Sequence, residues 1–436
     1  MSDLAKLVEQ SLRELALWDG SRFLVAFSGG LDSTALLLSL KELQRPLRAI
    51  HIDHQLQAAS RAWSEHCQAV CHTHGIELSS VTVDVAANTG EGLEAAARQA
   101  RYGAFEQALH HDEILATAHH ADDQLETLLL RLARGTGAAG MAGIPALAEF
   151  GRGRLARPLL NVRREALRRF VESLDVAWIS DPANDDPGFD RSYLRAQVVP
   201  ALRERWPAID VTAARLARLM ADANGLLEDV AATDIGEYTP DQPLPLAVLE
   251  PLGGARCRNL LRFWLRRCGC EAPSAAQLDS LLGLLTARSD GSPCLRWGNH
   301  EVRIYRAKLY VLQALRVGPV LEGWLTPSQA WQSDLGRLEL VPASVGGWSR
   351  ERAEAGFRVA GRLGGERFRP GPGRPSKTLK NWLQEEGVVP WMRESIPLLY
   401  CGDELVAIGD LWQGADGDVR PGEGWRVSWR NRPALF

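Results

Sequence analysis

The 436-residue sequence contains no apolar run that approaches the roughly 18–20 residues of a membrane-spanning helix. Its opening residues form an amphipathic helical pattern and not a signal peptide, so we expect a cytoplasmic protein with no membrane partner. The seven cysteines include no C-x-x-C pair and no paired zinc spacing, which excludes the common structural zinc modules. With 45% hydrophobic and 24% charged residues, the composition is that of a globular chain long enough for about two to four domains.

Two familiar phosphate-binding signatures are also missing, since no lysine follows the glycines at the Walker A offset and G-x-G-x-x-G is absent. Residues 23–40 instead join an apolar β-prone run to a helical pattern through a glycine turn. Such a turn lets the backbone approach a phosphate, which then faces the free N–H groups of the helix. The six-residue run Ser28, Gly29, Gly30, Leu31, Asp32 and Ser33 resembles the PP-loop of N-type ATP pyrophosphatases. The resemblance implies that these residues bind ATP and that Asp32 orders the loop or binds Mg²⁺; an ordinary strand-to-helix turn is the alternative.

Strand and helix patterns alternate through about residue 180. Apolar runs at 23–27, 47–52, 77–83 and 114–118 predict strands, and the segments 34–44, 59–74 and 92–110 predict helices. This alternation predicts an α/β fold with a doubly wound parallel sheet, whose ligands bind beyond the carboxyl ends of the strands. We expect this domain over residues 1–215, a mainly helical domain with a hairpin at 294–312 over 216–320, and a small α/β or mostly β domain over 321–436.

Carboxylates cluster where residues 119–127 open a helix. Asp122, Asp123 and Glu126 are three and four residues apart and can share a face, where they can hold Mg²⁺ or the ammonium group of an amine substrate. The alternative is a helix start stabilised by acidic residues. Arg131 and Arg134 project further along this helix and suit phosphate. At the tip of the second strand, Asp53 suits a ribose hydroxyl or a metal, whereas His51 and His54 are more often structural.

The net charge of −4 argues against a generally basic protein, but the cations are unevenly distributed. Seven arginines between residues 152 and 169 face only Glu165, and seven cations between 358 and 380 face only Glu366. Two local basic patches favour a polyanion held at chosen places, with solvated arginine-rich faces as the alternative. Arg191 and Arg195 lie four residues apart and either clamp phosphate or pair with Asp185 and Asp186.

Together these segments resemble the tRNA(Ile)-lysidine synthetase family. The matching pieces are residues 28–33, 51–54, 94–102, 119–127 with Arg131 and 134–136, 157–160, 181–195 and, at the other end, 382–412. Gln55 stands where a glycine usually follows, and Ala183 and Ser192 replace the usual serine and asparagine. Such enzymes adenylate the 2-carbonyl of the wobble cytidine with ATP, and the lysine ε-amine then displaces AMP. The product, lysidine, changes anticodon reading from AUG to AUA and tRNA identity from methionine to isoleucine.

The resemblance implies a ligase that uses ATP, Mg²⁺, L-lysine and tRNA(Ile) with a CAU anticodon, as a monomer or homodimer. The implied catalytic residues are Asp32, His119, Asp123, Glu126 and Arg131, with lysine near Asp122, Asp123 and Glu126. Asp53 joins the ATP site. The implied tRNA-binding residues are Arg98, Arg101, Arg134, Arg191, Arg195, Arg367, Arg369, Lys377 and Lys380. His119 or His120, or a carboxylate, is the candidate base for lysine.

Three alternatives compete with this interpretation. A PP-loop tRNA thiolation enzyme commonly needs a reactive cysteine pair or an iron–sulfur site, and neither spacing appears. A PP-loop ligase of small molecules leaves the basic C-terminal region without a purpose. An RNA-binding protein with a degenerate nucleotide site does not account for the intact residues 28–33 and the carboxylate cluster.

Overall fold

The computed structural model describes residues 1–436 except 56–59, 85–92, 181–187, 189, 240–241, 287–293, 314–321, 345, 370–375, 415–418, 420–421 and 433–436. The chain divides into two compact units, Met1–Asp229 and Val230–Phe436. None of the helices in the described ranges is both long and apolar enough to cross a membrane.

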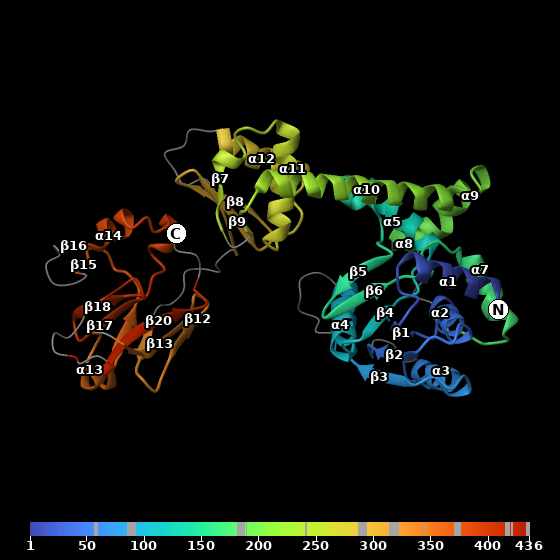
Figure 1. The fold of residues 1–436 in the computed structure, drawn as a ribbon, viewed down its shortest axis with the longest axis horizontal. Coiled ribbons are helices and arrows are strands. Elements are labelled where there is room, and N and C mark those ends of the chain that lie inside the picture. Colours follow the sequence, from blue (N-terminus) through green and yellow to red (C-terminus); the bar gives the residue numbers. More distant parts are fainter. Residues whose placement is uncertain are drawn as a thin grey trace. The chain divides into compact units, whose positions relative to one another are not determined.

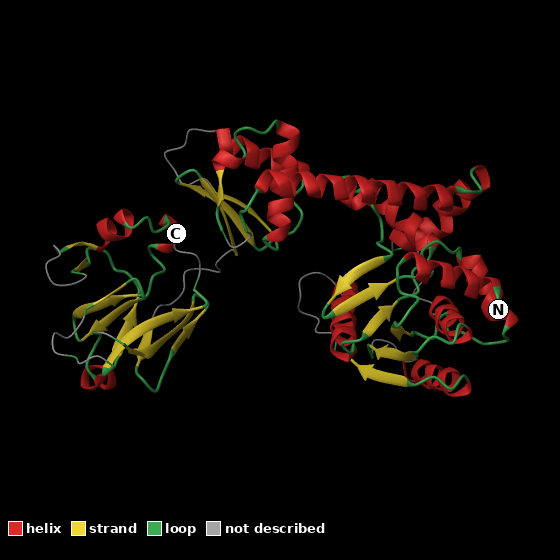
Figure 2. Cartoon of the chain, viewed as in Figure 1, coloured by secondary structure: helices red, strands yellow, loops and turns green. Residues whose placement is uncertain are grey.

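The first unit is built on a six-stranded sheet in the order β3-β2-β1-β4-β6-β5 (Figures 1 and 2). Its strands are β1 (Arg22–Ala26), β2 (Leu47–Asp53), β3 (Leu78–Thr82), β4 (Glu113–Ala116), β5 (Leu147–Phe150) and β6 (Gly153–Ala156). All neighbours pair in parallel except β5, which closes the edge antiparallel to β6. The predicted parallel sheet is confirmed, and the hairpin of β5 and β6 was not expected.

Helices cover both faces of this sheet because side chains of a buried strand alternate in direction. Phe23 and Val25 pack in one core with α1 (Asp3–Glu14), α2 (Leu31–Glu42), α3 (Ser60–Thr73) and α7 (Arg164–Ser173). Leu24 points the other way and packs with Phe105 of α4 (Leu93–Ala108). The strand β1 is therefore central, buried on both faces, and its carboxyl end leads directly into the glycine turn.

A helical layer follows the carboxyl end of β4. It contains α5 (Ala121–Ala133), α6 (Ala138–Met141), α8 (Asp190–Tyr193), a π-helical turn at Leu194–Val198, α9 (Val199–Arg205) and α10 (Ile209–Ile235). Leu125 and Leu128 of α5 form a small core with Val199, Ala213 and Ala217. This core fixes the start of the 27-residue α10 against the helix that bears the carboxylate cluster.

The second unit contains α11 (Gly254–Arg267) and α12 (Ala275–Thr286) together with an antiparallel sheet in the order β7-β10-β9-β8. The strands are β7 (Leu244–Pro245), β8 (Cys294–Trp297), β9 (His300–Tyr305) and β10 (Lys308–Gln313), so the expected hairpin at 294–312 is a three-stranded meander joined by β7. The boundaries at 215 and 320 stay predictions; residue 215 falls within α10, and residue 320 lies outside the described residues.

The C-terminal part of this unit is mostly β. A five-stranded sheet contains β11 (Glu322–Leu325), β14 (Phe357–Ala360), β17 (Leu398–Cys401), β18 (Glu404–Ile408) and β19 (Trp412–Gln413). A three-stranded sheet contains β12 (Trp331–Ser333), β13 (Gly336–Ala343) and β20 (Gly424–Arg430), and β15 (Arg367–Phe368) pairs with β16 (Lys377–Thr378). The helices are α13 (Arg350–Ala355) and α14 (Leu379–Glu385). The expected small α/β or mostly β region is thus confirmed.

Candidate active site

The glycine turn joins β1 to α2, with Gly30 as the residue before the helix. Gly29 has φ +77°, and a Cβ built there would lie 2.6 Å from Cδ1 of Ile179 and 2.9 Å from Sγ of Cys67. Only glycine therefore fits at this position. Oγ of Ser33 donates to the carbonyl of Gly30 at 3.0 Å and lies 3.1 Å from Oγ of Ser28, which closes the turn. The first-turn N–H groups of α2 are thereby directed to one edge of the sheet.

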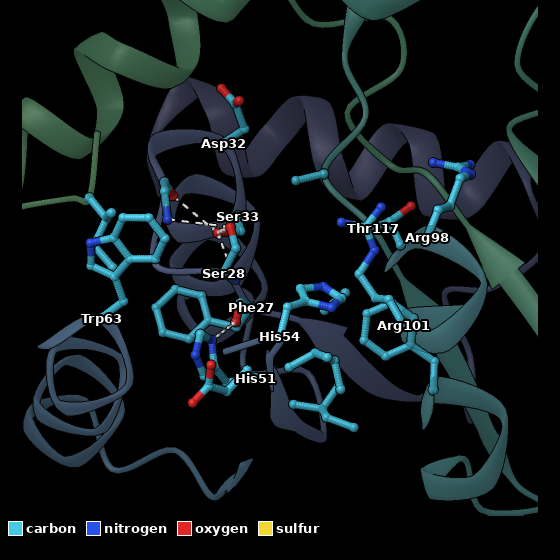
Figure 3. Close-up of a pocket in the computed structure, with 18 of the residues that line it drawn as sticks. Phe27, Ser28, Asp32, Ser33, His51, His54, Trp63, Arg98, Arg101 and Thr117 are labelled. Carbon is cyan, nitrogen blue, oxygen red and sulfur yellow. Dashed lines mark hydrogen bonds between the residues drawn. The ribbon is translucent and has the colours of Figure 1, made fainter. Parts of the chain in front are cut away.

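A cavity of about 560 Å³ opens at this edge, within the range of small-molecule sites. Figure 3 shows Trp63 of α3 on one side of Ser28 and Ser33, and Arg98 and Arg101 of α4 on the other. The tips of β2 and β4 complete the wall. An arginine-flanked cavity in front of a helix start has the positive charge and the hydrogen-bond donors that a nucleoside triphosphate needs.

Most of the predicted ATP-binding residues line this cavity. Of the predicted ATP residues, Ser28, Gly30, Asp32, Ser33 and Asp53 line the cavity, whereas Gly29 and Leu31 support it from behind. Arg98, Arg101 and Arg191, predicted for tRNA, line this same cavity. Trp63, Tyr102, Thr117 and Ile179 were missed because single aromatic, hydroxyl or aliphatic residues give no motif signal.

His120 lies at the centre of the carboxylate cluster. Its Nε2 is 3.6 Å from Asp32 and 3.5 Å from Asp123, and its Nδ1 is 3.7 Å from Asp122. Burial disfavours the imidazolium, but the three carboxylates outweigh burial and raise the pKa of His120. Burial likewise opposes charge on Asp32, but His120 and then Arg164 hold the pKa of Asp32 below its ordinary value. His120 therefore favours its charged form more than a free imidazole does, and it joins the glycine turn to α5.

Asp122 faces away from the cavity and forms an ion-pair chain. Its Oδ2 accepts from Nη2 of Arg203 at 2.6 Å, and its Oδ1 accepts from the backbone N–H of Arg164 at 3.1 Å. Arg203 also donates to the buried Asp210 at 2.8 Å, and Asp210 lies 3.1 Å from Nε of Arg163. Burial opposes the Asp122 charge, yet Arg203 and Arg164 hold the pKa of Asp122 below its usual range. This chain ties α5 to the first turn of α10.

Glu126 lies one turn further along α5 and is 1% exposed. Arg195 holds it through two hydrogen bonds, from Nε at 2.9 Å and from Nη2 at 3.1 Å. Burial raises the pKa of Glu126 in spite of this pairing. Arg195 pairs with Glu126, whereas Asp185 and Asp186 lie outside the described residues, so a pairing with them stays a prediction. Arg191 donates to Oγ1 of Thr127 at 3.5 Å.

His119 lines the cavity and differs from His120 in its charge state. Its Nδ1 lies 3.0 Å from Oγ1 of Thr117. Burial, and then the neighbouring Arg157, Arg98 and Arg191, lower the pKa of His119 to about 4 against the effect of Asp123. The imidazole is neutral near pH 7 and is able to accept a proton.

The two arginines at the end of α5 lie outside the cavity lining. Nη1 of Arg131 donates to the carbonyls of Gly140 and Gly143 at 2.6 and 2.8 Å, which folds the 135–143 segment back on the helix. Arg134 is exposed and pairs with Asp190 at 3.0 Å.

The C-terminal basic segment is partly neutralised by residues distant in sequence. Arg362 lies 2.9 Å from Glu394, Lys377 donates to Glu385 at 2.8 Å, and Arg367 donates to the carbonyl of Ser376 at 2.8 Å. Arg369 and Lys380 are exposed, and Arg374 lies outside the described residues. A second set of cations was missed altogether: Arg258, Arg262 and Arg266 recur every fourth residue on α11, and this 14-residue helix contains no acidic residue.

Three carboxylates line the cavity and are candidate ligands for magnesium, namely Asp32, Asp53 and Asp123. Among the described residues no three His, Cys, Asp or Glu side chains form a group able to hold a metal. Asp32 is a carboxylate at the cavity wall next to the helix start. One carboxylate fits Mg²⁺, because this ion is commonly held by one or two carboxylates together with substrate phosphates.

The parallel sheet, the glycine turn that demands φ > 0 and the cavity before it define a PP-loop protein. The family profile described as "PP-loop domain" matches residues 2–202, and those described as "TilS substrate binding domain" and "TilS substrate C-terminal domain" match 244–310 and 357–429. The chain is 40% identical over 430 residues to the tRNA(Ile)-lysidine synthase of Alkalilimnicola ehrlichii, covering 95% of each chain. It is 36% identical to that of Coxiella burnetii, covering 90% of this chain and 89% of the relative. This protein belongs to the tRNA(Ile)-lysidine synthase family.

One solved structure also resembles part of this chain. The U34-tRNA thiolase NcsA from Methanococcus maripaludis, solved with its iron–sulfur cluster, matches 50% of this chain and 79% of its own at 18% identity and a TM-score of 0.42. A similarity of that degree says nothing about the activity of this protein. The thiolation enzymes, the strongest alternative from the sequence, are therefore a related PP-loop family and not the family of this chain.

Proposed function

We propose that this protein ligates lysine to the 2-position of the wobble cytidine of tRNA(Ile) with a CAU anticodon, with AMP and pyrophosphate as products. The observation that supports the proposal most is that Asp123 and the glycine turn face one cavity while His120 joins them. A carboxylate beside a triphosphate site suits an amine substrate, because the carboxylate attracts the ammonium and the arginines attract the phosphates.

ATP is proposed to lie with its phosphates on residues 28–33, flanked by Arg98, Arg101 and Arg191. In the first step the O2 atom of cytidine attacks the α-phosphorus, and the bond to the bridging oxygen breaks to release pyrophosphate. The N–H groups at the start of α2 stabilise the charge that develops on the departing group. Mg²⁺, with Asp32 as its protein ligand, would neutralise phosphate charge when bound. Asp53 at the tip of β2 is placed to accept from a ribose hydroxyl.

Lysine is proposed to bind at Asp123, the carboxylate of the cluster that lines the cavity. Asp122 and Glu126 lie near this position but outside the cavity lining. Arg203 holds Asp122, and Arg195 holds Glu126. In the second step the amine nitrogen forms a bond to C2, and the C2–O bond breaks so that the oxygen leaves with AMP. The amine must first lose a proton, and the proposed acceptors are two groups that line the cavity: the carboxylate of Asp123 and the neutral imidazole of His119, which its low pKa makes a weak base. Arg131 contributes by fixing the loop that follows α5.

The tRNA is proposed to contact cations in both units. Arg134 and the cavity arginines belong to the first unit, whereas Arg367, Arg369, Lys377 and Lys380 belong to the C-terminal region. The arginine row of α11 lies within the segment that matches the substrate binding domain, so we add Arg258, Arg262 and Arg266 to this set. Contacts of this kind give affinity without reading bases.

One assay tests the proposal against its alternatives. Purified protein is incubated with ATP, bulk tRNA and labelled pyrophosphate, with and without lysine, and then with labelled lysine. We expect exchange that depends on tRNA, and label that enters only isoleucine tRNA when lysine is labelled. Exchange without tRNA would indicate a ligase of small molecules, and no exchange with intact tRNA binding would indicate a binding protein; either result would contradict the proposal.

A further inference from the structure

Two aromatic side chains and an arginine form a row across the five-stranded sheet of the C-terminal part. Trp324 of β11 pairs with Arg358 of β14, and Arg358 pairs in turn with Tyr400 of β17. Residues directly opposite one another on neighbouring strands point to the same side, so the three side chains share one face of the sheet. Trp324 is 55% exposed, Arg358 is exposed and Tyr400 is half-buried. These three residues are called the Trp-Arg-Tyr row below.

The rest of this sheet face is covered, so the row is its open part. Two residues before Tyr400, Leu398 is fully buried, and its neighbour Ile408 on β18 is buried as well. At the edge of the same face, Trp412 of β19 packs against Trp382 of α14 with ring centroids 6.0 Å apart. Figure 1 shows α14 beside the pair of β15 and β16, and β15 contacts β18. These elements cover one half of the face and leave the Trp-Arg-Tyr row uncovered.

The arginine of the row is stacked but not neutralised. Cζ of Arg358 lies 4.7 Å from the centre of the Tyr400 ring, and no carboxylate in the described part of the chain forms an ion pair with it. Glu366 approaches Tyr400, but its carboxylate already accepts from two backbone N–H groups and lies 3.6 Å from Nε of Arg362. Glu322 shares the face at the exposed start of β11. The row therefore offers aromatic faces and one uncompensated cation.

We propose that the Trp-Arg-Tyr row binds unpaired nucleotides at the 3′ end of the substrate tRNA by stacking on their bases. Aromatic rings and guanidinium planes on a sheet face are the groups on which unstacked RNA bases lie, whereas a double helix keeps its base faces covered. The exposed Arg369 and Lys380, on the elements that cover the rest of the face, suit the phosphates of the same strand. The inference rests on the proposed function, in which the cavity of the first unit takes the anticodon. The 3′ end is then the remaining free run of unpaired bases.

A thermodynamic cycle tests this contact. Filter binding of the full-length chain is measured with intact tRNA(Ile) and with the same tRNA lacking its unpaired 3′ nucleotides. Trp324→Ala should weaken binding of the intact tRNA about tenfold, as expected for one lost base stack. The wild type should lose at least as much when the tRNA is truncated, and the two proteins should bind the truncated tRNA alike. Trp324→Phe keeps an aromatic ring and should restore most of the affinity.

Trp206→Ala is the matched control, because Trp206 is 53% exposed but belongs to the first unit, and it should bind both tRNAs as the wild type does. Thermal unfolding of each variant checks that the fold is kept. A wild type that binds no tRNA would overturn the proposed function and this inference together. Wild-type binding that Trp324→Ala leaves unchanged, or weakens equally for both tRNAs, would overturn the inference alone. Unchanged tRNA binding with a lower mass in sedimentation would also overturn it, and would assign the row to a second copy of the chain.

Discussion

Glu126 and Arg195 form a two-point ion pair between elements that are 69 residues apart, with both carboxylate oxygens held at 2.9 and 3.1 Å. The carboxylate is 1% exposed, whereas the arginine side chain is 37% exposed. The pair therefore fastens the π-helical turn to α5 from its buried side. Both carboxylate oxygens of Glu126 are occupied by this contact, whereas Asp123 lines the cavity.

Removal of Arg195 should destabilise the first unit. Arg195→Met leaves the buried Glu126 without a partner, and we expect a loss of about 1–3 kcal/mol in the free energy of unfolding. The range lies below that for a fully buried pair because Arg195 is partly solvated. Urea denaturation measures the loss. Arg134→Met, which breaks an exposed pair with Asp190, is the control and should cost under about 1 kcal/mol. Equal losses for both would contradict the tethering role.

Asp123 should decide lysine affinity. Asp123→Asn removes the charge at the cavity, so the KM for lysine should rise about tenfold or more, as expected for one charge-assisted hydrogen bond. The KM for ATP should change less than about twofold. Steady-state kinetics of lysine incorporation measures both constants. A rise in the KM for ATP as large as that for lysine would instead assign Asp123 to the metal.

The two glycines of the turn should respond differently to alanine. Gly29→Ala requires φ +77° and places Cβ 2.6 Å from Ile179, so we expect a lower melting temperature and lost ATP binding. Gly30→Ala meets nothing closer than 3.5 Å and should keep the melting temperature of the wild type. Calorimetry of the two variants makes the comparison. Similar melting temperatures would show that the turn relaxes around Gly29.

His120 should make stability depend on pH. Because its pKa is raised above the unfolded value of about 6.5, its charged form stabilises the fold fully below that value. The stabilisation is lost as the pH rises through the folded pKa. Asp32 and Asp122 have pKa values below the ordinary value for aspartate, so both remain carboxylates over the range in which a histidine titrates. The difference in the free energy of unfolding between wild type and His120→Gln should thus be largest between about pH 4 and 6.5 and shrink above it. A difference that grows with pH would be incompatible with a charged His120.

Salt dependence should separate the cations of the C-terminal region that have no partner among the described residues from the paired ones. Arg369→Ala with Lys380→Ala should weaken tRNA binding and flatten the log–log salt slope by about two units, at roughly 0.9 per lost phosphate contact. Arg350→Ala is the control, because Arg350 is also exposed but pairs with Glu354 on α13. Filter binding across a salt series provides the slopes. An unchanged slope in the double variant would remove these residues from the RNA surface.

Short-range sequence patterns predicted the central strands and the glycine turn. The run 23–33 combines a buried strand, a turn and a helix start, and each of these has its own short-range chemistry. The hairpin of β5 and β6 was missed because its strands are four residues each and contain charged residues such as Arg154. Short strands of that kind form through pairing with β4, which no window of sequence reports.

The partners of the carboxylates could not be predicted. Arg164 and Arg203 look like surface cations in sequence, yet they hold Asp32 and Asp122 across the fold. The local count of charges overestimated the basic character of the C-terminal segment for the same reason, because Glu385 and Glu394 pair with cations of that segment. Gln55 was noted as a departure from glycine, and its φ of +53° explains why glycine suits that position.

The chain of ion pairs around Asp122 has a consequence for biosynthesis. The sheet is complete once Ala156 is made, but the cations that pair with Asp32, Asp122 and Glu126 arrive later, at Arg164, Arg203 and Arg195 in that order. A nascent chain that has left the ribosome only as far as the sheet would have these three carboxylates without their arginines. Native packing of α5 therefore requires that the first turn of α10 has been synthesised. A pause in translation before that point would prolong the lifetime of an incompletely folded intermediate.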